Sequence, residues 1–245
     1  MTRESLLQRR ELLRLCAAGV FSIMHERLHG EEAIPAERAV DHLLLGAADL
    51  DAAIVWFEQK TGVKAQPGGS HPGVGTRNAL AALGGRRYLE IIAPDPAQSA
   101  FNFQIDVRKL AQPRLVTWAA AAADMDRTAA AAREAGYQLF GPRDGSRARP
   151  DGKMLRWKSL GVMNQLGGAG VEPIPFFIQW AADSPHPSQD SPGGCELRSF
   201  EIAHPDAKAV ADALRKLGVQ AKTKQAASAA LTAVLQTPRG TVTLS

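Results

Sequence analysis

The pattern of hydrophobic and polar positions predicts a β-α-β-β-β unit in the first half of the chain. Short apolar runs bounded by turn residues are typical of buried strands, and a longer stretch between two of them has helical character. Asp49 suits the N-cap of this helix, Gly62 its end, and Gly84-Gly85 a hairpin turn. Residues 67–75 are rich in Pro and Gly and are expected to form a loop. The five predicted elements cover residues 40–46, 52–60, 63–66, 76–83 and 87–92.

The same order of elements recurs further along the chain. Asp124-Met125-Asp126 repeats the capping pattern of the first helix, and the second helix ends at Gly136. The alanines at 119–123, just before this cap, fit either a strand or a helix. A polar loop is expected over 141–152. Strands of this second copy are predicted over residues 115–118, 137–140, 154–160 and 174–180.

A shorter third copy begins at Glu196. Asp206 caps its helix, which ends at Gly218, and a last hairpin is expected over 230–236 and 241–244. These repeats predict an α+β protein built from tandem βαβββ modules. The predicted boundaries are 1–35 for an N-terminal helix or leader, 36–182 for two paired modules (38–96 and 113–182), and 195–245 for a third, partial module.

The N-terminal segment leaves two interpretations open. Residues 4–29 show helical spacing of apolar positions, and Gln8-Arg9-Arg10-Glu11-Leu12-Leu13-Arg14 resembles a twin-arginine export signal. No clean small-x-small cleavage site follows the apolar stretch at 15–24, which favours a cytoplasmic protein over an exported one. The segment would then be an amphipathic helix that packs on the domain or on the second subunit of a homodimer.

Composition and charge limit the classes of partner. Hydrophobic residues make up 45% of the chain and charged residues 22%, as in soluble globular proteins. The net charge is +4, but Lys and Arg are spread along the chain, so nucleic-acid binding is not expected. No apolar run approaches the ~20 residues of a transmembrane segment. The densest basic cluster, over 143–158, is either a solvated hairpin or a rim that attracts anionic substrates.

Several familiar kinds of site are missing from the sequence. Cys16 and Cys195 form neither a disulfide framework nor a zinc pattern. No Gly-rich loop has the spacing of a phosphate cradle or of a dinucleotide site, so no nucleotide cofactor is expected. The chain also lacks the Gly-x-Ser-x-Gly turn that carries a nucleophilic serine in hydrolases.

His42 and Glu90 stand out because each interrupts an apolar strand. A histidine in such a place is often a structural residue, and a strand carboxylate often lies on an exposed face. An unpaired buried charge is costly, however, so a buried Glu90 needs a cation, a metal ion or a protonated histidine beside it. These residues by themselves mark Glu90 as the stronger candidate and leave His42 open between a structural and a functional role.

Three short motifs resemble the first module of the glyoxalase/bleomycin-resistance/dioxygenase (vicinal oxygen chelate) superfamily. They are Asp41-His42-Leu43-Leu44-Leu45-Gly46, Asp49-Leu50-Asp51-Ala52-Ala53 and Tyr88-Leu89-Glu90-Ile91-Ile92. The stretch at 69–78 (Gly-Ser-His-Pro-Gly-Val-Gly-Thr-Arg-Asn) resembles the glyoxalase-like domain family within it. The resemblance covers about residues 40–180 and implies paired βαβββ modules that form a curved mixed sheet around a cavity.

The resemblance also implies a divalent transition metal, held by one residue from the first strand and one from the fourth strand of each module. His42 and Glu90 occupy these positions in the first module, and their ligand chemistry suits Fe, Mn, Ni, Co or Zn. A register based on Asp51 and Asp126 places Thr117 and Gln179 at the second module's positions. Thr117 is a poor ligand and Gln179 a weak one, so the expected metal set is His42, Glu90 and Gln179, without a full quartet.

The expected function is action on a small oxygenated molecule. Glu90, with its pKa raised by an apolar setting, or the loop residue His71 would serve as base, in lyase, isomerase or dioxygenase-type chemistry. The alternatives are a protein that sequesters a small molecule without turnover, and a module whose N-terminal helix binds a partner. Because Arg77 and Asn78 alternate, only one of them can face the cavity. The expected substrate-binding residues are Arg77, Asn78, Trp180 and Arg156.

Overall fold

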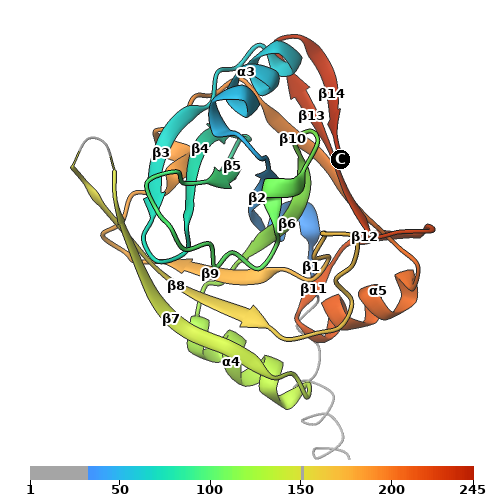
Figure 1. The fold of residues 1–245 in the computed structure, drawn as a ribbon. Coiled ribbons are helices and arrows are strands. Elements are labelled where there is room, and N and C mark those ends of the chain that lie inside the picture. Colours follow the sequence, from blue (N-terminus) through green and yellow to red (C-terminus); the bar gives the residue numbers. More distant parts are fainter. Residues whose placement is uncertain (1–32, 150–151) are drawn as a thin grey trace, which may run out of the picture. The chain divides into compact units, whose positions relative to one another are not determined.

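A computed structural model describes residues 33–149 and 152–245, of which Ile34–Ser245 form one compact unit. Ten elements of this unit make up two β-α-β-β-β modules (Figure 1). The first module consists of β2 (Val40–Gly46), α3 (Leu50–Thr61), β3 (Gln66–His71), β4 (Thr76–Ala82) and β5 (Tyr88–Pro94). The second consists of β6 (Arg114–Ala121), α4 (Met125–Glu134), β7 (Leu139–Ala148), β8 (Met154–Val162) and β9 (Phe176–Trp180). The expected N-terminal helix and Cys16 lie outside the described residues.

The two modules join into a single mixed sheet of eight strands, in the order β3-β4-β5-β2-β6-β9-β8-β7. The sheet is strongly curled, as Figure 1 shows, and this confirms the predicted α+β fold. At its centre β2 and β6 are antiparallel, with His42 opposite Ala119 and Leu44 opposite Thr117. An approximate two-fold axis between the modules superposes His42 on Thr117 and Leu44 on Ala119. Thr117 is therefore the counterpart of His42, as the sequence register predicted.

The helix ends follow the predicted capping residues. The Asp49 carboxylate accepts a hydrogen bond from the Ala52 amide, and Gly62 ends the helix in a left-handed conformation. Asp124 and Asp206 cap α4 and α5 (Ala207–Lys216) in the same way. Short polar side chains at these positions satisfy amide groups that have no partner within the helix.

The segment predicted as a third module, called the third repeat below, covers the back of the curled sheet. It has the expected order of elements but not the strand pairing of the two modules, because its first strand lies between its second and third strands. Its strands form a separate sheet in the order β12-β10-β13-β14, comprising β10 (Glu196–His204), β12 (Lys222–Gln225), β13 (Ala230–Thr237) and β14 (Gly240–Leu244). Phe200 on β10 packs on Trp118 of β6 with ring centroids 5.2 Å apart, and both side chains are fully buried. A two-stranded sheet of β1 (Ile34–Pro35) and β11 (Val219–Gln220), next to α2 (Ala36–Ala39), ties the start of the described unit to this repeat.

Two long connections between the strands pack against the curled sheet. The first, over residues 95–113, includes η1 (Val107–Lys109) and crosses the mouth of the sheet in Figure 1. Val107 is fully buried against Leu44 and Ile92 in a small second core. The other connection, over 181–195, includes η2 (Pro187–Gln189), which lies against β4.

Two segments predicted as loops are strands at the edges of the sheet. Residues 67–71 belong to β3 and pair with β4, and residues 141–148 belong to β7 and pair with β8. Their Pro, Gly and Arg residues obscured the strand pattern, because edge strands tolerate residues that central strands exclude. Pairing with a neighbouring strand, which the sequence does not display, decided these segments. The alanines of 119–121 likewise form part of β6.

Candidate active site

The candidate site begins with a β-bulge at Asp41. Val40 pairs with Ala120 and His42 with Ala119, so Asp41 is an extra residue in the ladder. A bulge re-aims side chains, and here the Asp41 carboxylate Oδ1 lies 2.8 Å from Nδ1 of the neighbouring His42. Strict alternation would have sent these two side chains to opposite faces. The sequence analysis therefore missed Asp41, whose only signal was its place beside a histidine within a buried strand.

Asp41 accepts two further hydrogen bonds at its other oxygen. Trp180 Nε1 and His186 Nε2 each lie 3.1 Å from Oδ2, and Asp41 and His186 are almost fully buried. Burial alone would raise the pKa of Asp41, but the hydrogen bonds from His186 and His42 outweigh it and lower that pKa to about 2. Asp41 is thus a carboxylate at neutral pH, and Nδ1 of His42 carries a proton toward it.

This contact directs Nε2 of His42 toward Glu90. The two residues lie on the adjacent parallel strands β2 and β5, and Nε2 is 3.5 Å from Glu90 Oε2. Tyr88 stacks on the imidazole with centroids 4.5 Å apart, and Phe176 meets it edge-on at 5.5 Å. His42 is therefore held in one orientation, with the Nε2 lone pair of its neutral form available to a proton or a metal ion.

The other oxygen of Glu90 faces residues from β3 and β4. Asn78 donates a hydrogen bond from Nδ2 to Oε1 at 2.6 Å, and His71 Nε2 lies 3.5 Å from the same oxygen. Asn78 Oδ1 in turn accepts a hydrogen bond of 2.9 Å from Arg147, which reaches in from β7 of the second module. The site thus joins both modules, and Arg147 is a residue that the sequence analysis did not select.

The electrostatics of the cluster differ from one expectation. Burial raises the pKa of Glu90, but His71, His42, the Asn78 hydrogen bond and Arg147 outweigh it, so the net shift is downward. The prediction of a raised pKa was wrong, because the apolar setting of the strand does not include these polar neighbours. Burial lowers the pKa of His71, so at neutral pH its imidazole is uncharged. Nδ1 of His71 lies 2.8 Å from the Thr76 hydroxyl, and Asn78 Nδ2 lies 3.3 Å from its Nε2.

The second module supplies no matching pair of ligands. β6 is parallel to β9, with Ala119 opposite Phe176, just as Leu44 lies opposite Glu90 in the first module. The counterpart of Glu90 is therefore Phe176, and the assignment of Gln179 was wrong. The side chain of Gln179 bonds to the backbone of Ala123 and Met125 beside α4.

The remaining sequence candidates divide between the two faces of the sheet. Asn78 faces Glu90, whereas Arg77 pairs with Asp51 of α3 at 3.1 Å and lies away from the cluster. Arg156 pairs with the exposed Asp183 and is also away from it. Trp180 is near the cluster through its bond to Asp41. Asn78 and Arg147 therefore contact the cluster, whereas the ion pairs of Arg77 and Arg156 lie outside it.

His42 and Glu90 provide part of what a divalent metal ion requires. His42 Nε2 and Glu90 Oε2 form an imidazole–carboxylate pair of the right chemistry for a divalent transition ion, and Asp41 supplies the partner that orients such a histidine. His71 faces the opposite oxygen of Glu90. Within the described ranges, no three His, Cys, Asp or Glu side chains are grouped to hold an ion. A metal on this pair would therefore take its other ligands from water and substrate.

The curled sheet of paired βαβββ modules, with polar residues of the first and fourth strands facing each other, defines a vicinal oxygen chelate fold. The family model described as "Glyoxalase-like domain" matches residues 40–218. The chain belongs to this glyoxalase-like domain family. No curated protein matches the chain.

Solved structures include similar folds. A hypothetical protein from Staphylococcus aureus is 16% identical, with 78% of this chain and 87% of that chain covered and a TM-score of 0.63. A methylmalonyl-CoA epimerase from Streptomyces coelicolor, in complex with 2-nitronate-propionyl-CoA, is 22% identical over 60% of this chain and 97% of its own, with a TM-score of 0.43. The epimerase from Mycobacterium tuberculosis is 19% identical over 62% and 90%, with a TM-score of 0.39. The shared fold rests on the family match and the Staphylococcus aureus structure.

Proposed function

We propose that this protein is an enzyme that acts on a small oxygenated molecule, with lyase, isomerase or dioxygenase-type chemistry at His42 and Glu90. The observation that carries the proposal is the buried line from Asp41 through His42 to Glu90, with contacts of 2.8 Å and 3.5 Å. A buried imidazole locked in one orientation against two carboxylates is costly to form. Such an arrangement is characteristic of sites where a proton or a cation is handled.

Each residue of the cluster has a distinct role in this proposal. Asp41 holds the proton on Nδ1 of His42, so the Nε2 lone pair points at Glu90. His42 and Glu90 would hold a divalent ion (Fe, Mn, Ni, Co or Zn), which when bound acts as a Lewis acid on a carbonyl or enolate oxygen. His71 is uncharged at neutral pH and is the most accessible of the three, with 18% of its side chain exposed. It would accept the proton that the substrate loses.

A sequestering protein is the second candidate, because the second module supplies Thr117 and Phe176 in place of ligands. A site with half the usual ligand set could still bind a small molecule without turning it over. The two functions predict that different groups, a metal ion or an organic molecule, stay bound to the purified protein.

Metal analysis of protein purified without chelators tests both proposals. The enzyme predicts about one transition ion per chain, lost in His42→Ala and in Glu90→Gln. Glu201→Gln serves as the matched control, because Glu201 is a strand carboxylate of β10 that pairs with Lys222 and Lys224. A metal-free protein that retains a tightly bound organic molecule would instead support sequestration. Absence of both metal and ligand would contradict the two proposals together.

A further inference from the structure

Arg147 is a buried cation that makes no direct ion pair with the described residues, and Glu90, whose pKa it helps to lower, lies beyond Asn78. The residue exposure of Arg147 is 6%, and its one hydrogen bond goes to the neutral amide oxygen of Asn78. None of the ion pairs among the described residues includes Arg147, whereas Arg149 and Arg156 on the same hairpin each pair with an aspartate. A guanidinium has five N–H donors, so most of its binding capacity is unused here. A buried charge in this state is costly unless a counter-ion joins it.

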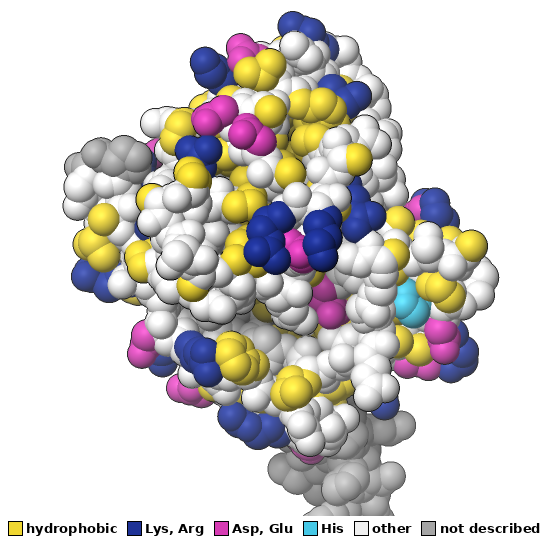
Figure 2. Space-filling view, in the orientation of Figure 1, with side chains coloured by type: hydrophobic (Ala, Val, Ile, Leu, Met, Phe, Trp, Pro, Cys, Tyr) yellow, Lys and Arg dark blue, Asp and Glu magenta, His cyan; other side chains and the backbone are white. Residues whose placement is uncertain are grey.

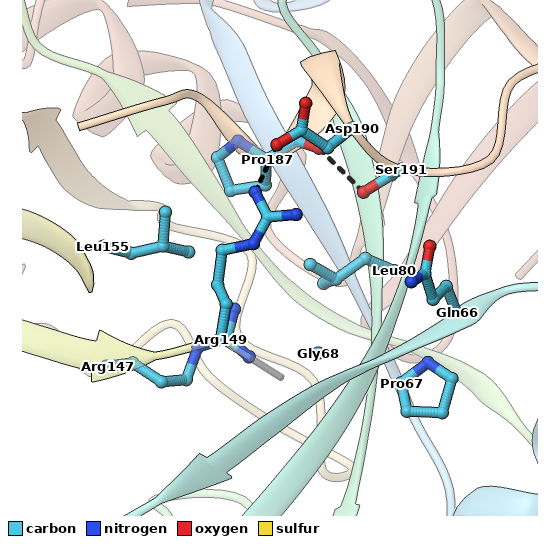
Figure 3. Close-up of a pocket in the computed structure, with 10 residues that line it drawn as sticks. All are labelled: Gln66, Pro67, Gly68, Leu80, Arg147, Arg149, Leu155, Pro187, Asp190 and Ser191. Atoms are coloured by element: carbon cyan, nitrogen blue, oxygen red, sulfur yellow. Dashed lines mark hydrogen bonds and ion pairs between the residues drawn. The ribbon is translucent and has the colours of Figure 1, made fainter. Parts of the chain in front are cut away.

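Arg147 is one of the residues that line a hollow of about 120 Å³, shown in Figure 3. The hollow lies between β3 and β7, the two edges of the curled sheet, with Leu155 and Pro187 among its walls. Arg149 and Asp190 also line it, and Figure 3 shows them joined to each other. The Arg149 charge is thus compensated by Asp190, and Arg147 gives the hollow its net positive charge.

The backbone of β3 is built to admit Arg147. Gly68 is the extra residue of a bulge in the β3–β4 ladder. A Cβ atom at this position would lie 2.5 Å from Asn78 Oδ1 and 2.7 Å from Arg147 Nη1. Any side chain here would therefore displace the Arg147–Asn78 pair, which explains why a Pro-Gly-Gly sequence occupies an edge strand.

The hollow also adjoins the proposed reaction site. Leu80, one of its walls, is directly opposite Glu90 in the β4–β5 ladder. The single amide of Asn78 separates Arg147 from Glu90, with contacts of 2.9 Å and 2.6 Å. Glu90 is not among the residues that line the hollow, so the Asn78 amide separates a ligand that contacts Arg147 there from Glu90.

We propose that Arg147 binds the carboxylate of the ligand, so the protein acts on small carboxylic acids such as hydroxy or oxo acids. The planar fork of the guanidinium matches the two oxygens of a carboxylate. The volume of the hollow accommodates a carboxylate on a short carbon chain. That the protein acts on the bound acid rests on the proposed function, whereas the carboxylate contact itself depends only on Arg147.

The test compares lactate with its neutral isostere lactamide by ligand-observed NMR titration of chelator-treated protein. The wild-type protein should bind lactate at least about tenfold more tightly than lactamide, because only lactate forms charge-assisted hydrogen bonds. Arg147→Met should abolish this preference. Arg198→Met is the matched control, since it removes an exposed, ion-paired arginine of β10 and should leave the preference unchanged.

Two further variants keep the test decisive if Arg147→Met fails to fold. Gly68→Ala should weaken lactate binding by displacing the guanidinium, and Arg147→Lys should retain the charge but lose most of the preference with the fork. The proposal is overturned if wild-type protein does not bind lactate, if it prefers inorganic phosphate, or if Arg147→Met keeps the preference. Metal content is measured on separate preparations of the same proteins, purified without chelators. Wild-type protein that holds metal but shows no lactate preference overturns only the carboxylate proposal. Wild-type protein that shows the preference but holds neither metal nor a bound organic molecule overturns only the proposed function.

Discussion

At the scale of single residues, the site depends on the hydrogen-bond partners of the two oxygens of one carboxylate, that of Asp41. Asp41 Oδ1 serves His42, while Oδ2 serves Trp180 and His186. The Ser188 backbone amide donates to His186 Nδ1, so the proton of neutral His186 is on the Nε2 that faces Asp41. Three ring N–H groups thus converge on one buried anion. Removing the charge should change the proton positions of the cluster more than its shape.

Asp41→Asn should move the proton of the neutral His42 ring from Nδ1 to Nε2. The two donors at Oδ2 require an oxygen, so the new amide NH₂ group would face His42 Nδ1 and force the proton to Nε2. The lone pair that faces Glu90 would then be lost. We expect metal affinity to fall by about 10–100-fold, as for other partners of ligating histidines. Competition with a coloured chelator measures this change, and an unchanged affinity in folded Asp41→Asn protein would contradict the assigned role.

Asp41 should also make the stability of the protein fall in acid. Its folded-state pKa is about 2, below the ordinary value of 3.8, so its contribution is fully present above about pH 4 and disappears as the pH falls toward 2. The shift corresponds to about 2 kcal/mol of unfolding free energy. Urea titrations of wild type and Asp41→Asn at pH 6 and pH 3 check this. The difference in stability between the two proteins should shrink at the lower pH; a constant difference would argue against the lowered pKa.

At the scale of elements, the edges and bulges of the sheet position the site. The bulge at Asp41 in β2 has a counterpart in β6. There Leu115 pairs with Leu45 and Thr117 pairs with Leu44, so Val116 is the extra residue. Both modules therefore have a bulge at this place, but only the first carries ionisable residues there, Asp41 and His42, where the second has Val116 and Thr117. The loop after β3 also positions the site, because it connects the β3–β4 hairpin, which carries His71 and Asn78, to the segment over 95–113.

Gly75→Ala should destabilise this junction strongly. Gly75 has a φ of +81°, and a Cβ atom would lie 1.9 Å from the Ala100 carbonyl oxygen. Because the clash is with backbone, it cannot be relieved by a side-chain rotation, and we expect a loss of at least about 3 kcal/mol. Gly73→Ala is the control, since its φ of +76° is similar but no atom lies within 4 Å of its Cβ position. Equal losses of urea midpoint in the two variants would show that backbone conformation alone sets the cost.

At the scale of the molecule, the third repeat completes the core of the paired modules. Trp118 and Phe200 are among the largest fully buried side chains, and the main core includes residues from all three repeats. Lys, Arg, Asp and Glu side chains are interspersed with apolar ones on the face drawn in Figure 2. No helix of the described chain is long and apolar enough to cross a membrane. Residues 34–245 are therefore expected to unfold as one unit.

Phe200→Ala tests this integration. Removing the ring leaves a cavity beside Trp118, for which we expect a loss of about 3–5 kcal/mol. The tryptophan fluorescence and far-ultraviolet circular dichroism transitions should remain coincident in urea, because both sheets share this core. Two separate transitions, with the fluorescence change unaffected by the substitution, would show instead that the third repeat folds independently.

The sequence by itself determined the order of elements and the capped helices, because these follow from local periodicity and capping chemistry, and the family resemblance of its short motifs placed His42 with Glu90. It also identified Thr117 as the counterpart of His42, since helix caps fix the register between repeats. Only the tertiary structure decided the edge strands β3 and β7, the role of Asp41 and the replacement of Gln179 by Phe176. These depend on bulges and on ladder register, which no local pattern records. Arg147 reaches Asn78 from the other module, and a contact between residues so far apart in the chain exists only after the sheet has curled.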